Sequence, residues 1–192
     1  MLKKPLTIHP HLWRMARHSA AAQPNLNRKP TNPNTQAAEQ RHILTVHETT
    51  PNGRIKKIKT IGDSYMCAGG LPVSNQSHAI DVVSAAIEIR DFMLREKLKY
   101  EALGKPFFEI RIGCHTGPVV AGIVGIKKFA YDIWGDTVNI ASRMESTGVA
   151  GKVNVSGTTY ALISTKFHCQ ERGKIEARNK GMIDMYFVDN AK

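Results

Sequence analysis

The sequence predicts an α+β domain over residues 55–190, preceded by a basic segment over residues 1–54. Short apolar runs of alternating polarity occur in pairs separated by turn residues, which is typical of β-hairpins. Two longer stretches place apolar residues at helical spacing. Strands clustered as hairpins with helices between them favour an α+β sheet that helices cover on one face.

Residues 1–54 have little regular pattern. Polar residues dominate, and six prolines interrupt the segment: Pro5, Pro10, Pro24, Pro30, Pro33 and Pro51. Such a stretch cannot bury enough apolar surface to offset the entropy lost on ordering, so we expect it to be largely disordered. Weak local patterns favour a basic helix over Leu12–Ala22 and a strand over His42–Glu48.

The domain is predicted to begin with two strands, Ile55–Thr60 and Tyr65–Leu71, because Gly62-Asp63-Ser64 between them favours a turn. A helix from about Ser77 to Lys97 is predicted next. Phe107–His115 alternates as a strand. The turn residues Thr116-Gly117-Pro118 then lead into Val119–Val124, and the two runs are predicted to pair as a hairpin.

The stretch Tyr131–Thr147 is predicted as a short strand, a tight turn at Gly135 and a helix capped by Asp136 or Thr137. Asn139 and Arg143 stand one helical turn apart, so an amide and a guanidinium project side by side where they could meet an anion. Predicted elements complete the sheet: a strand Val153–Val155, a helix Ser156–Ile163 capped by Ser156, and strands Phe167–Gln170 and Met185–Val188.

Composition excludes some classes of protein. The formal net charge of +11 is uneven, because residues 1–57 hold ten Lys or Arg and two acidic residues, a net +8. The folded part is nearly balanced, so no nucleic-acid partner is expected for it. No apolar run is long enough for a transmembrane helix. Three widely spaced cysteines predict reduced thiols in a cytoplasmic chain.

Three segments occur in a fixed order: Lys56–Pro72, Ile110–Gly125 and Tyr131–Thr147. Together they resemble the signatures of the class III nucleotidyl cyclases, the adenylyl and guanylyl cyclase family. The resemblance covers about Ile55 to Val188. It implies a ferredoxin-like βαββαβ core with added elements. The family's first strand and first two helices are predicted to be missing, as in an N-terminally truncated domain.

The resemblance also implies a metal site. The family holds two Mg²⁺ or Mn²⁺ ions with two aspartates, one in a Gly-Asp turn and one in an earlier Phe-x-Asp-x-x-x-Phe-Thr motif. Asp63 matches the first of these positions, although a turn aspartate is an ordinary alternative. The other aspartate has no counterpart, because the chain contains no Asp before Asp63, and Glu48 is a poor substitute.

The family's substrate-contacting residues have counterparts in this chain. Lys59 and Asp132 stand where the family reads the purine, and the resemblance implies that they meet the ring nitrogen and the amine of adenine. Guanylyl cyclases tend to carry Glu and Cys there. Asn139 and Arg143 match the residues that orient the ribose and stabilise the α-phosphoryl group. Arg178 replaces the Lys that meets the terminal phosphates.

These residues predict an adenylyl cyclase-type domain that converts ATP to cyclic AMP and pyrophosphate for intracellular signalling, with weak or lost activity in this chain alone. The resemblance implies a homodimer or a heterodimer with another cyclase domain, because the family's active site forms between two subunits. A non-catalytic pseudocyclase that binds nucleotide or pairs with an intact cyclase is the alternative. A third reading makes residues 1–57 a tether to nucleic acid or an anionic membrane.

Overall fold

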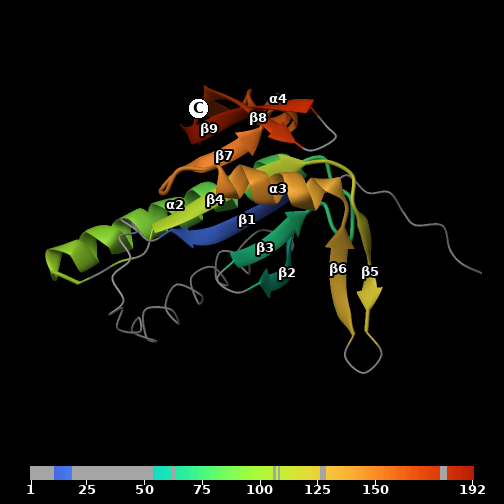
Figure 1. Cartoon of the computed structure of the whole chain (residues 1–192), viewed down its shortest axis with the longest axis horizontal. Helices are drawn as coiled ribbons and strands as arrows, with labels where there is room; N and C mark the ends of the chain where they lie inside the picture. The colour runs from blue at the N-terminus through green and yellow to red at the C-terminus, as the bar shows by residue number, and fades with distance from the viewer. Residues whose placement is uncertain are drawn as a thin grey trace, which may run out of the picture.

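A computed structural model of the protein describes residues 11–18, 54–61, 64–105, 107, 109–125, 129–177 and 181–192. The strands of this part form a seven-stranded sheet of order β2-β3-β1-β4-β7-β9-β8 and a two-stranded sheet of β5 and β6 (Figure 1). The strands are β1 (His11–His18), β2 (Ile55–Ile61), β3 (Ser64–Gly69), β4 (Glu109–Thr116), β5 (Val120–Val124), β6 (Ala130–Trp134), β7 (Val153–Ser156), β8 (Phe167–Ala177) and β9 (Gly181–Ala191). The helices are α2 (His78–Ala102), α3 (Asp136–Ser146) and α4 (Gly157–Ile163).

Most of the predicted elements are confirmed. β2 and β3 pair as an antiparallel hairpin, and α2, β7, α4, β8 and β9 occur where expected, several of them longer than predicted. The hydroxyl of Ser156 caps α4 by accepting a hydrogen bond from the backbone N–H of Thr159. All three cysteines are free thiols. None of the described helices has the length and apolar content needed to span a bilayer.

The strand β1 was not expected. The prediction of a helix over Leu12–Ala22 is wrong for residues 12–18, because β1 pairs antiparallel with β3 on one side and with β4 on the other. The resulting order β2-β3-β1-β4 is that of the ferredoxin-like fold. The prediction that the first strand is missing is therefore also wrong, whereas the predicted strand His42–Glu48 lies outside the described residues.

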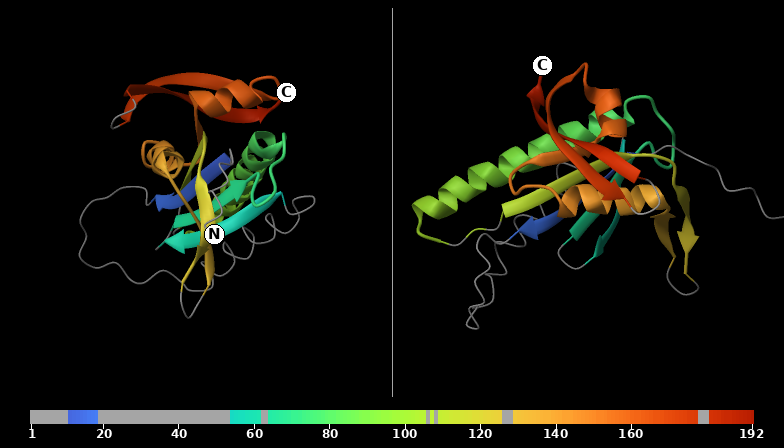
Figure 2. Two further views of the ribbon diagram at one scale, coloured as in Figure 1. Left: turned by 90° about the vertical axis from the view of Figure 1, so that its right-hand side faces the viewer. Right: turned by 45° about the horizontal axis from the view of Figure 1, so that its top comes forward.

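Helices cover both faces of the sheet, not one as predicted. Tyr65, Cys67, Ile112 and Cys114 face α2 in the main apolar core. Residues that alternate with these point to the other face, where Met66 packs in a smaller cluster with Ala141 of α3. Figure 2 shows α2 and α3 on opposite sides of the central strands. On α3, Asp136, Asn139, Arg143 and Ser146 are exposed.

The strands β5 and β6 form a separate hairpin that projects from the sheet (Figures 1 and 2). The prediction that Val119–Val124 pairs with the preceding strand is wrong, because β5 pairs with β6. Both edges of β4 are already occupied, by β1 and by β7, so no place for β5 remains there. The hairpin ends at Gly135, directly before α3.

Candidate functional site

Lys59 and Asp132, which are 73 residues apart in the sequence, form an ion pair. The Nζ atom of Lys59 lies 2.7 Å from Oδ2 of Asp132, and the side chains are 38% and 17% exposed. Oδ1 of Asp132 accepts a hydrogen bond of 2.8 Å from the backbone N–H of Ile133. The two residues that sequence analysis assigned to one base-binding site therefore do lie together.

A β-bulge in β2 accounts for the direction of the Lys59 side chain. The pairing of β2 with β3 shifts between Lys57, which lies opposite Cys67, and Lys59, which lies opposite Met66. A bulge adds one residue to a strand and re-aims the side chains beyond it. Ile58, the extra residue, packs against the apolar cluster at the base of the hairpin, and Lys59 reaches Asp132 on β6.

The turn between β6 and α3 needs glycine. Gly135 has φ of 131°, a conformation that side chains with a Cβ rarely adopt. Gly135 is the N-cap residue, so neither Asp136 nor Thr137 occupies the cap position predicted for them. The buried hydroxyl of Thr137 instead donates a 2.6 Å hydrogen bond to the backbone oxygen of Pro118, which ties the first turn of α3 to the start of the hairpin.

Asn139 and Arg143 lie on successive turns of α3, and neither is buried in the core. The guanidinium of Arg143 donates a long hydrogen bond of 3.3 Å to the backbone oxygen of Glu176 on β8. The prediction that they project side by side from one helix face is consistent with this placement. They do not contact Lys59 or Asp132 within the described part of the chain, so the structure brings together two pairs and not one cluster of four.

The inner face of α3 is held tightly against β4. A Cβ on Gly113 would overlap the backbone nitrogen of Glu145, so only glycine permits this approach. The Glu145 side chain is 3% exposed, and its Oε1 accepts a 2.9 Å hydrogen bond from Nε of Arg111. Nδ2 of the buried Asn154 donates to the backbone oxygen of Met144. These contacts fix the rotation of α3 and hence the direction of Asn139 and Arg143.

The predicted metal ligand Asp63 and the predicted phosphate ligand Arg178 lie outside the described residues. The residues that are described do not fit a two-ion site. β1, which takes the place of the family's first strand, reads His-Leu-Trp-Arg-Met-Ala-Arg-His and has no carboxylate. Across the described ranges, no group of three or more His, Cys, Asp and Glu side chains lies close enough to hold a metal ion.

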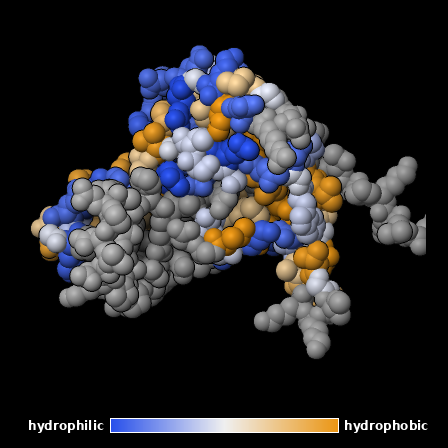
Figure 3. Space-filling model, in the orientation of Figure 1, coloured by the Kyte–Doolittle hydropathy of each residue, from blue (hydrophilic) through white to orange (hydrophobic). Residues whose placement is uncertain are grey.

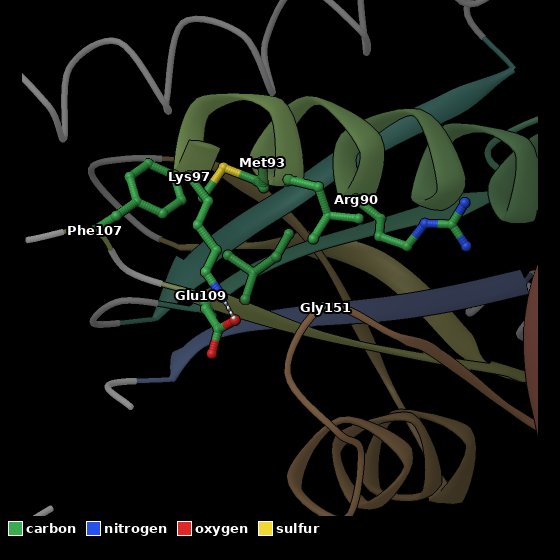
Figure 4. A pocket seen from close by; sticks show the side chains of 8 residues that line it. Arg90, Met93, Lys97, Phe107, Glu109 and Gly151 are labelled. Atoms are coloured by element: carbon green, nitrogen blue, oxygen red, sulfur yellow. Dashed lines mark hydrogen bonds and ion pairs between the residues drawn. The ribbon is translucent and has the colours of Figure 1, made fainter. Parts of the chain in front are cut away.

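Apart from the Lys59–Asp132 pair, a hollow lies between α2 and the start of β4 (Figure 4). Its charged groups already have partners. Nζ of Lys97 lies 2.6 Å from Oε1 of Glu109, and Arg90 donates to the backbone oxygens of Val188 and Asp189. A neighbouring groove of about 490 Å³, lined in part by Lys152, shares Arg90 and Glu109 with this hollow. The resemblance assigns no substrate-contacting residue to this surface, so Lys59 and Asp132 are the stronger candidate.

Most contacts that support the site could not be predicted from the sequence. The bulge that turns Lys59 has no sequence signal, because Lys-Lys-Ile-Lys also suits a regular edge strand. The close approach at Gly113 did have a signal, an isolated glycine inside an apolar strand, which often marks a neighbouring backbone. The pairing of Glu145 with Arg111 has no local signal, because it depends on how α3 packs on β4.

The known proteins that are similar to this chain in sequence include guanylate and adenylate cyclases. A family described as "Adenylate and Guanylate cyclase catalytic domain" matches residues 34–190. The chain is 42% identical over 147 residues to "Guanylate cyclase soluble subunit beta-2" of Rattus norvegicus, a match that covers 76% of this chain and 20% of the relative. It is 38% identical over 138 residues to "Adenylate cyclase" of Mycobacterium bovis, covering 72% of this chain and 30% of the relative.

A solved structure is also similar, the catalytic core of a rhodopsin-guanylyl cyclase with converted specificity in complex with ATPalphaS. The TM-score is 0.79 at 28% identity, and the match covers 96% of each chain. By contrast, this chain spans only about a fifth to a third of the two curated relatives. The family match includes the whole of the described domain from β2 to β8 and nearly all of β9. The chain belongs to the adenylate and guanylate cyclase catalytic domain family.

Proposed function

We propose that this domain is of the adenylyl type and binds ATP, with the Lys59–Asp132 pair as its adenine-reading group. The contact of 2.7 Å between these two side chains is the observation that carries the proposal. It puts a cationic donor beside an anionic acceptor at the positions that the family uses for the purine. Guanylyl cyclases are among the relatives, so the proposal depends on these two residues and not on overall similarity.

The ion pair leaves both groups able to meet a base. A lysine ammonium has three donors, and the contact with Asp132 uses one of them. Each carboxylate oxygen has two lone pairs, and Oδ1 and Oδ2 of Asp132 have each used one. An adenine ring nitrogen can accept from Lys59 while the exocyclic amine donates to Asp132. The pair would therefore bind adenine without first having to separate.

Asn139 and Arg143 suit the reacting end of the substrate. In cyclisation the ribose 3′-oxygen forms a bond to the α-phosphorus, the bond to pyrophosphate breaks, and the hydroxyl proton leaves to solvent. The planar guanidinium of Arg143 can donate two hydrogen bonds to phosphoryl oxygens as charge develops on them. The Asn139 amide, one turn earlier on α3, can hold the ribose in position.

A second cyclase domain is the proposed partner, in a homodimer or heterodimer. The placement of Asn139 and Arg143 outside the core suits a site that another surface completes. The projecting hairpin has apolar side chains that are open to solvent, and they gather on the right of the face in Figure 3. Exposed apolar patches of this kind mark protein contacts. Cytoplasmic signalling through cyclic AMP follows as the proposed role.

The absence of any carboxylate on β1 favours a second candidate function. Without a partner to Asp63, the chain cannot supply the pair of aspartates that the family uses for its two ions. The domain would then be a pseudocyclase that binds nucleotide and pairs with an intact cyclase as a regulatory half. Both functions use the same nucleotide-facing residues, so base binding is the property to test first.

Calorimetry can test the base preference without requiring turnover. Lys59→Glu combined with Asp132→Cys should weaken binding of ATP relative to GTP, because each polar group left unpaired costs about 1–3 kcal/mol. Lys56→Glu, an exposed lysine on the same strand, is the matched control and should leave the ratio unchanged. An unaltered ATP-to-GTP ratio in the double variant would mean that Lys59 and Asp132 do not contact the base.

A further inference from the structure

The β5–β6 hairpin is joined to the seven-stranded sheet in two ways. Its base packs in a small apolar cluster, where Val119 and Ile133 meet Met66 and Leu71. The second connection is the Lys59–Asp132 ion pair. Among the ion pairs of the described residues, only this one links the hairpin to the rest of the domain. The others connect the large sheet and its helices with one another or lie within α2.

The ion pair joins the middle of the hairpin to the edge strand of the large sheet. Asp132 lies in the middle of β6, opposite Gly122 of β5. Lys59 approaches from the edge strand of the large sheet, beyond the bulge. The contact therefore joins the middle of β6 to β2, between Tyr131 and Ile133, whose side chains lie in or against the apolar cluster. A contact at this point limits how far the hairpin can swing about its base.

The hairpin also carries the apolar surface assigned above to the partner. Ile123 is 71% exposed and Phe129 is 76% exposed, and Val120, Val124 and Trp134 of the same hairpin are also exposed. The direction in which the hairpin points decides where this surface meets a second domain. A contact that fixes the hairpin therefore also bears on pairing.

We propose that the Lys59–Asp132 ion pair is a tether that couples base binding to the position of the hairpin. An adenine that accepts from Lys59 and donates to Asp132 would bridge the same two elements and strengthen the tether. By linkage, a ligand that favours one hairpin position also raises the affinity for a partner that binds this position. The tether is a property of the fold alone, whereas its coupling to adenine rests on the proposed function.

Hydrogen exchange of the hairpin amides tests the tether without nucleotide. Lys59→Asp and Asp132→Lys, each alone, put like charges together and should speed exchange in β5 and β6 about 2- to 5-fold, the range for a partly exposed ion pair. The double variant restores a pair of opposite sign and should return exchange to the wild-type rate. Lys56→Asp, with the same change of charge on an exposed lysine of β2, should have no effect. Equal exchange in the wild type and both single variants would overturn the tether.

Added nucleotide tests the coupling. ATP at saturation should slow hairpin exchange in the wild type a further 2- to 10-fold, roughly as expected for one or two added hydrogen bonds. Inorganic triphosphate, which has no base, should not, and the double variant should show no slowing by ATP. If calorimetry detects ATP binding but the wild-type hairpin exchanges at an unchanged rate, the coupling is wrong and the proposed function stands. If the double variant recovers wild-type exchange and ATP does not bind at all, the tether stands and the proposed function fails.

Discussion

His115 is a buried histidine at the end of β4, where hydroxyl groups enclose its ring. Nδ1 lies 2.7 Å from Oγ of Ser156 and 3.2 Å from Oγ1 of Thr158. Ser156 also caps α4, so the ring links the sheet to this helix. Burial penalises the charged imidazolium and lowers the pKa of His115 to about 4. The folded state therefore holds this residue in its neutral form.

Acid should destabilise the domain through this residue. The pKa of His115 is about 4 when folded and about 6.5 when unfolded, so between these values the unfolded chain binds the proton first. The free energy of unfolding should fall as the pH drops from 6.5 to 4, by at most about 3 kcal/mol. Urea unfolding of the wild type and His115→Gln across this range measures it. Equal pH dependence in the two proteins would contradict the prediction.

At the scale of elements, the packing of α3 on β4 controls the direction of Asn139 and Arg143. Gly113→Ala would force its methyl group into the backbone of Glu145, and overpacking of this kind costs about 1–3 kcal/mol. We expect a lower unfolding midpoint in urea. Gly122→Ala on β5 is the control, since its Cβ would lie 3.7 Å from Trp134, an ordinary contact. Similar losses in both variants would show that the close approach at Gly113 is not the cause.

Local elements could be predicted from the sequence, whereas the pairing between distant strands could not. Local turn chemistry and alternation correctly predicted the β2–β3 hairpin, the turn at Gly135 and the cap at Ser156. Pairing between strands depends on which edges are open. The turn after β4 favoured a hairpin with β5, but β1 and β7 already hold both edges of β4. His11–His18 form a strand because two neighbours enclose them, an effect that overrides weak helical spacing.

Likewise, the residues of the candidate site could be predicted from the sequence, whereas the contacts that position them could not. The resemblance assigned Lys59 and Asp132 to one base-binding site, and the structure joins them by an ion pair. The bulge that permits this contact could not be predicted, because nothing in the composition of β2 distinguishes a bulged strand from a regular one. The placement of Asn139 and Arg143 depends on how α3 is rotated, which Gly113 and Glu145 decide through contacts distant in sequence.

At the scale of the whole molecule, the proposed nucleotide-contacting residues are present, whereas one of the family's two metal-binding aspartates has no counterpart in this chain. Lys59, Asp132, Asn139 and Arg143 belong to the set that the resemblance assigns to base, ribose and phosphate. β1 has no carboxylate to pair with Asp63. In a homodimer of this chain, neither composite site would contain both metal-binding aspartates. In a pair with an intact cyclase domain, one of the two composite sites would receive both aspartates from the intact partner.

Because only an intact partner would supply both aspartates, the outcome of mixing the two domains can be predicted. The chain alone should make cyclic AMP very slowly, and so should a cyclase domain that keeps both aspartates but has its own transition-state Arg replaced by Ala. Mixed together, they should form one complete site, with this chain supplying Arg143, and produce cyclic AMP faster than either alone. The matched control is Arg143→Ala in this chain, which should pair equally well by sedimentation but restore nothing. A heterodimer that sediments as one species without any gain in cyclic AMP would show that these residues do not form a working half-site.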